Sequence, residues 1–130
     1  MFYEQLKAAT ESDRQQLINS EIIVRCMARN VTLPEYIDYL TQAYHHVKFT
    51  VPLLMAVGAR LPESYEWLRS AVAEYIEEEL GHQEWVLNDI AACGGDKEAV
   101  RNSKPAIETE LMVAYAWDMV SRVDPIGFFG

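Results

Sequence analysis

Hydrophobic residues recur every three to four positions along almost the whole chain, which is the spacing of one face of an α-helix. No segment alternates hydrophobic and polar residues for long enough to predict a β-strand. Short stretches that contain glycine, proline or capping residues separate the periodic segments. The pattern predicts helices over residues 3–9, 13–28, 34–59, 62–92, 96–102 and 105–123.

The predicted helix boundaries also indicate how the helices pack. Thr32 is placed to cap the helix that starts at Pro34, because proline and Glu35 suit a first turn. Pro52 is expected to kink this helix. Long helices joined by short loops pack antiparallel, so we expect residues 1–130 to form a single all-α domain, a helical bundle.

Composition and charge limit the partners of such a domain. Half of the residues are hydrophobic, and 11 basic residues against 20 acidic ones give a net charge of −9. This charge argues against nucleic acid or an anionic membrane surface as partner. We see no membrane-spanning segment and no signal peptide. Cys26 and Cys93 lack a CxxC spacing, so we expect reduced thiols in a cytoplasmic protein.

One carboxylate in the predicted helix 62–92 falls within its apolar stripe. A buried carboxylate needs a cation, a positive side chain or a proton, and Glu79 is in this position. His82 follows three residues later, which places both side chains on one face. Glu-x-x-His is the unit that di-iron carboxylate bundles use, and mixed carboxylate and imidazole ligation suits iron. We therefore predict that Glu79 and His82 bind a metal.

The preceding helix supplies a further candidate ligand. His45 and His46 flank opposite sides of its apolar stripe, so only one of them can face a given site. Tyr75 and Asp89 are candidates for partners that orient the ligands. Simpler interpretations remain open: a Glu-x-x-His sequence arises by chance in acidic helices, and a histidine pair is often a core histidine beside an exposed one.

Three segments together resemble a known superfamily. They are the sequences LPEYIDYL (33–40), YHHV (44–47) and EEELGHQEWVLND (77–89). They resemble the heme-oxygenase-like superfamily, which includes thiaminase II (TenA), the pyrroloquinoline-quinone synthesis oxygenase and the non-heme di-iron oxidases called iron-containing redox enzymes. The resemblance is closest to the last branch. It implies a heme-oxygenase-like bundle of which this chain is about the first half, either incomplete or completed by a second chain.

The resemblance also implies a non-heme iron centre, with one or two ions. Glu79 and His82 carry over as ligands, and His45 or His46 would occupy a position that is commonly a glutamate. The branch takes its remaining ligands from a later histidine-containing segment, whereas no histidine follows His82 here. We expect an iron-dependent oxidase or oxygenase that acts on a small organic substrate, as a homo-oligomer, most simply a dimer.

Two other functions stay open. A thiaminase-like hydrolase would need a cysteine nucleophile, and neither Cys93 at a helix end nor Cys26 in an early helix is an obvious candidate. A non-catalytic binding or assembly module would use the apolar C-terminal segment 124–130. In that case a dimer would bury Phe128 and Phe129 without any metal.

Overall fold

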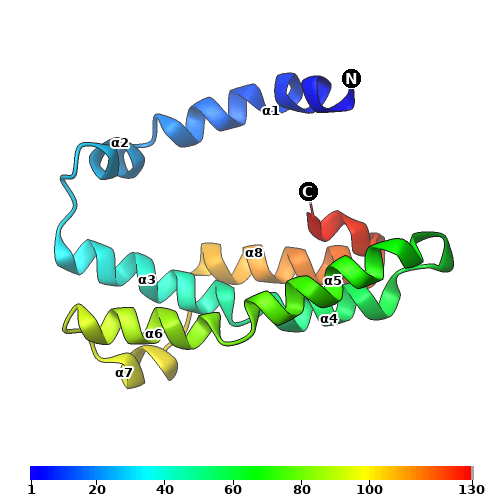
Figure 1. The fold of residues 1–130 in the computed structure, drawn as a ribbon. Coiled ribbons are helices and arrows are strands. Elements are labelled where there is room, and N and C mark those ends of the chain that lie inside the picture. The colour runs from blue at the N-terminus through cyan, green and yellow to red at the C-terminus, as the bar shows by residue number, and fades with distance from the viewer. Residues whose placement is uncertain (130) are drawn as a thin grey trace. The chain divides into compact units, whose positions relative to one another are not determined.

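The computed structural model describes residues 1–129, and every element in this range is helical (Figure 1). The chain divides into two compact units, Met1–Tyr36 and Ile37–Gly130, which are described separately below. In chain order the elements are α1 (Phe2–Ile18), α2 (Glu21–Met27), α3 (Leu33–Val47), α4 (Thr50–Arg60), the 3-10 segment η1 (Glu63–Tyr65), α5 (Glu66–Glu79), α6 (His82–Ala92), α7 (Lys97–Arg101), α8 (Ile107–Asp118), the π-helical segment η2 (Met119–Val123) and the 3-10 segment η3 (Pro125–Phe129).

The N-terminal unit begins with one long helix where the sequence predicted a boundary at residues 10–13. The Thr10 hydroxyl donates to the carbonyl of Leu6 instead of capping a new helix. Glu11 accepts a hydrogen bond of 2.8 Å from Gln15 and pairs with Arg14, both on the next turn. These polar residues therefore bond within the helix, and the predicted boundary was wrong.

The start of α3 is capped as the sequence predicted. The Glu35 carboxylate accepts a hydrogen bond of 2.8 Å from the Thr32 backbone N–H, and the Thr32 hydroxyl accepts one from the Glu35 N–H. This reciprocal pair is a capping box. Arg25 donates to both carboxylate oxygens, at 2.6 and 2.8 Å. Arg25, together with Thr32, lowers the pKa of Glu35 to about 2.

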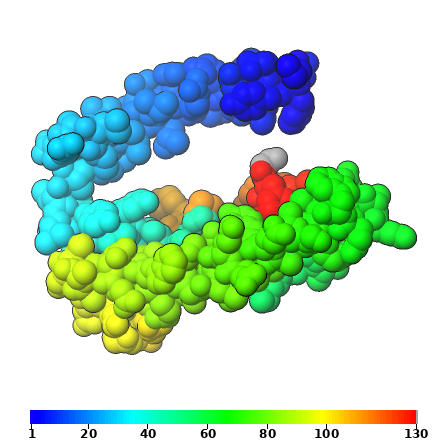
Figure 2. Space-filling view, viewed as in Figure 1, coloured from blue at the N-terminus to red at the C-terminus, as the bar shows by residue number. Residues whose placement is uncertain are grey.

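The C-terminal unit is organised around two hydrophobic clusters. Buried residues of α4, α5 and η2 form the first cluster, in which Leu54 and Val57 are fully buried. Residues of α3 and α6 form the second: Leu40, Tyr44, Leu87 and Ile90. Figure 2 shows α5 and α6, in green, running across the face of this unit that is turned to the viewer. The α3–α4 and α5–α6 segments thus form two layers that share both clusters.

Each of these two segments was predicted as one long helix, the first with a kink at Pro52, and each is broken near its middle. The first break lies at residues 48–49, between α3 and α4. Pro52 falls in the first turn of α4, where a missing N–H leaves no hydrogen bond unmade, so the chain breaks before Pro52. The second break lies between α5 and α6 at Gly81, which has φ +91°. Glycine adopts this conformation without strain.

Helix α8 is anchored to α3 by one side chain. The Gln42 amide oxygen accepts hydrogen bonds from the Ala106 N–H at 2.9 Å and from the Thr109 hydroxyl at 2.8 Å. After α8 the chain continues through η2 and η3, where Ile126 and Phe128 pack against the first cluster. The apolar C-terminal segment therefore packs on its own unit through Ile126 and Phe128, whereas Phe129 is 44% exposed and Gly130 lies outside the described residues.

Candidate metal site

The Glu79–His82 pair lies at the break between α5 and α6. Glu79 is the last residue of α5, and His82 is the first residue of α6. Glu79 Oε2 lies 2.9 Å from His82 Nδ1, and the two side chains are 20% and 29% exposed. The Trp85 ring, one turn further along α6, lies 4.3 Å from the imidazole, centroid to centroid. The break therefore brings a carboxylate and an imidazole into direct contact at a half-buried position.

This contact orients the imidazole. A carboxylate accepts hydrogen bonds, so we assign the proton of the ring to Nδ1, where it points at Glu79. In the neutral ring Nε2 then carries a lone pair. Histidine ligands in metalloproteins commonly have this arrangement, in which a carboxylate holds one nitrogen and the metal binds the other. The pair can also supply one oxygen and one nitrogen to the same ion.

The two histidines of α3 lie in different surroundings. His45 is 1% exposed, and its Nε2 lies 2.8 Å from the Ser103 hydroxyl while its Nδ1 lies 3.2 Å from Lys48 Nζ. Burial, with a smaller contribution from Lys48, lowers the pKa of His45. His46 is exposed and lines a shallow groove between α3 and α8. His45 thus has a partner for both ring nitrogens.

The remaining candidates do not join the pair. Tyr75 and Asp89 are exposed, and neither is hydrogen-bonded to Glu79 or His82. Within residues 1–129 no three His, Cys, Asp or Glu side chains are grouped so that they could hold a metal ion. Cys26 is exposed, Cys93 is half-buried, and both are free thiols. The described residues therefore bring together Glu79 and His82, without a third donor.

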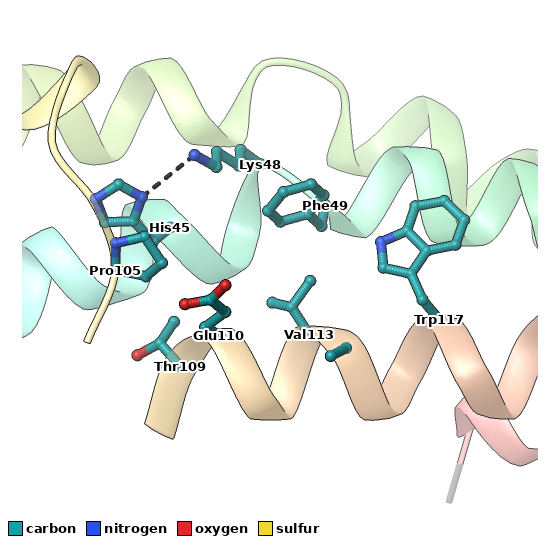
Figure 3. Close-up of a pocket in the computed structure, with 9 residues that line it drawn as sticks. His45, Lys48, Phe49, Pro105, Thr109, Glu110, Val113 and Trp117 are labelled. Atoms are coloured by element: carbon teal, nitrogen blue, oxygen red, sulfur yellow. Dashed lines mark hydrogen bonds between the residues drawn. The ribbon is translucent and has the colours of Figure 1, made fainter. Parts of the chain in front are cut away.

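A pocket that the sequence analysis missed lies between the α3–α4 break and α8 (Figure 3). Its volume is about 380 Å³. The residues that line it come from positions up to 72 apart in the chain, so no local motif indicates it. They are His45, Lys48, Phe49, Pro105, Thr109, Glu110, Val113, Ala114 and Trp117.

Comparison with solved structures identifies the class of fold. A crystal structure from Shewanella denitrificans OS217, described as a domain of unknown function with a heme oxygenase-like fold, matches with a TM-score of 0.80 and 29% identity. The match covers 95% of this chain and 54% of that one, so the chain spans about half the length of its structural relative. The predicted all-α, heme-oxygenase-like fold is thereby confirmed.

The family follows from the sequence of the C-terminal unit. The family model of the iron-containing redox enzymes matches residues 37–130, and the chain belongs to this family. None of the curated proteins matches the chain. Over residues 1–129, no helix is both long enough and apolar enough to span a bilayer. The family predicted from the three sequence segments is thus confirmed, and its description associates it with iron and redox chemistry.

Proposed function

We propose that this chain is part of a non-heme iron-dependent oxidase or oxygenase that acts on a small organic substrate. In this proposal Glu79 and His82 supply two of the iron ligands. The observation that carries it is the contact of 2.9 Å between Glu79 Oε2 and His82 Nδ1, at the break between two helices of the matched family region.

The donor atoms of the pair fit iron. Carboxylate oxygen and imidazole nitrogen are the ligand types of non-heme iron sites that react with dioxygen, and such sites use at least three protein ligands. Iron would supply the dioxygen chemistry, with a carboxylate oxygen of Glu79 and a ring nitrogen of His82 as its ligands in place of their contact with each other. Trp85 packs against the imidazole, which restricts its rotation.

The two donors require further ligands. Both nitrogens of His45 are already hydrogen-bonded, and His46 lines the groove between α3 and α8 rather than the break between α5 and α6. Other ligands would come from water, from the substrate or from another polypeptide. A second copy of the chain is one such source, so a homodimer is part of the proposal.

Binding of ferrous iron under anaerobic conditions tests the proposal without any assay of activity. The unaltered chain should bind Fe(II), and Glu79→Gln and His82→Gln should each weaken binding by about tenfold or more. Glu78→Gln is the matched control, because it removes the same charge from an exposed neighbouring residue. An unaltered chain that binds no iron would refute the proposal, as would equal binding by all three variants.

A further inference from the structure

The ammonium group of Lys48 has no acidic partner among residues 1–129, although it lines the pocket beside α8. Its nitrogen lies 3.2 Å from His45 Nδ1 and 5.3 Å from the ring centroids of both Tyr44 and Phe49. An ammonium has three N–H donors, and His45 uses one of them. A positive charge with free donors therefore faces the pocket.

His45 fixes the position of this charge without adding to it. Lys48 can only donate, so His45 Nδ1 accepts and His45 Nε2–H donates to the Ser103 hydroxyl. Ser103 in turn donates to the carbonyl of Val100 at 2.8 Å. This direction of bonding leaves the imidazole neutral, and it excludes His45 as a base that activates Ser103, because His45 donates to that hydroxyl.

The opposite wall of the pocket carries a negative charge. Glu110 lies in the first turn of α8, and its carboxylate points into the space between α8 and the α3–α4 break (Figure 3). Over the described residues it forms no ion pair, either with Lys48 or with another base. Phe49, Val113 and Trp117 provide the apolar part of the lining.

We propose that this pocket binds a small zwitterion with an apolar substituent, such as an α-amino acid with an aromatic side chain. The ligand carboxylate would pair with Lys48, its ammonium group with Glu110, and its apolar group would lie against Phe49, Val113 and Trp117. The volume of about 380 Å³ falls in the range of small-molecule sites. The proposal goes beyond iron binding, because it uses neither Glu79 nor His82.

Three compounds that share a phenyl group test separately whether the pocket recognises a carboxylate and an ammonium group. L-phenylalanine carries both charges, 3-phenylpropionate only the carboxylate, and 2-phenylethylamine only the ammonium. Titrations monitored by NMR on the metal-free chain should show L-phenylalanine binding in about the millimolar range, as expected for a ligand of this size. Each compound with one charge should bind about tenfold more weakly. Failure of iron binding would leave this result unaffected.

Substitutions test whether Lys48 recognises the carboxylate of the ligand and Glu110 its ammonium group. Lys48→Met should make L-phenylalanine bind no better than 2-phenylethylamine, and Glu110→Gln should make it bind no better than 3-phenylpropionate. Lys104→Met and Glu108→Gln are the matched controls, since both residues are exposed and lie outside the pocket lining. They should leave all three affinities unchanged.

Three results would overturn the proposal. The first is equal binding of the three compounds, which would indicate an apolar cavity that does not recognise charge. The second is the absence of saturable binding by L-phenylalanine. The third is a loss of affinity in the control variants as large as in the pocket variants. The comparison of compounds on the unaltered chain needs no substitution, so it remains decisive even if Lys48→Met fails to fold.

Discussion

Replacing Gly81 with alanine tests whether its backbone conformation holds the break between α5 and α6. Gly81 has φ +91°, and a Cβ added there would meet no heavy atom within 4 Å. Gly81→Ala therefore causes no steric clash with the rest of the unit, and its cost arises in the backbone alone. For an L-residue the left-handed region costs about 1–2 kcal/mol. We expect this loss in the free energy of unfolding.

Urea unfolding followed by tryptophan fluorescence measures this effect. Trp67, Trp85 and Trp117 all lie in the Ile37–Gly130 unit, so the signal reports on the unit that contains the break. With an m-value of about 2 kcal/mol/M, the midpoint should fall by about 0.5–1 M urea. Gly81→Asn should lose less than Gly81→Ala, because asparagine tolerates positive φ better than alanine.

Gly58→Ala is the matched control. Gly58 lies inside α4, and its added Cβ would lie 3.4 Å from Val72 Cγ1, an ordinary van der Waals contact. Alanine is the better helix former, so this variant should be as stable as the original or up to about 1 kcal/mol more stable. If Gly81→Ala matched or exceeded the original stability while Gly58→Ala behaved as expected, the positive φ at the break would not be a constraint.

Two further predictions concern pH. The pKa of His45 is lowered in the folded chain, so as pH falls the unfolded chain binds a proton at His45 before the folded chain does. The stability contributed by neutral His45 should therefore be fully present above a pH of about 6.5 and should decrease as pH falls below it. Urea unfolding at several pH values should show this slope, and an unchanged slope in His45→Gln would contradict the assignment. The Glu35 carboxyl should titrate at about 2 by NMR, so the stability that it contributes is present above the ordinary carboxyl pKa and lost as pH falls toward 2. Arg25→Met should move this titration up toward the ordinary range, and no movement would exclude the Arg25 contact as its main cause.

Helical periodicity predicted the existence of most elements but not their interruptions. The period of apolar residues continues through both breaks, and an isolated glycine such as Gly81 is tolerated in a helical pattern. An isolated glycine inside a continuous helical pattern therefore does not by itself predict a break. The cap formed by Thr32 and Glu35 was predictable because capping boxes depend on residues three positions apart.

In the candidate sites too, contacts between residues close in the sequence were predictable, and contacts between distant residues were not. The sequence predicted Glu79 and His82 on one face of a continuous helix, whereas they meet across the break at Gly81, and metal binding by the pair stays a prediction. The partner of His45 is Ser103, 58 positions along the chain, and Lys48 and Glu110 share a pocket although no sequence pattern connects them. Only the packing of α8, and of the loop that precedes it, beside α3 brings these residues together.

The link through Gln42 has a consequence for the pocket. Its single amide oxygen holds both the Ala106 N–H and the Thr109 hydroxyl, so a directional polar contact sets where α8 starts along α3. Apolar packing is not directional and tolerates sliding. Changes among the apolar residues of α8 can therefore remodel the shape of the cavity while Lys48 and Glu110 stay in its lining. Selectivity for the apolar group of a ligand and recognition of its charges are thus separable properties of this scaffold.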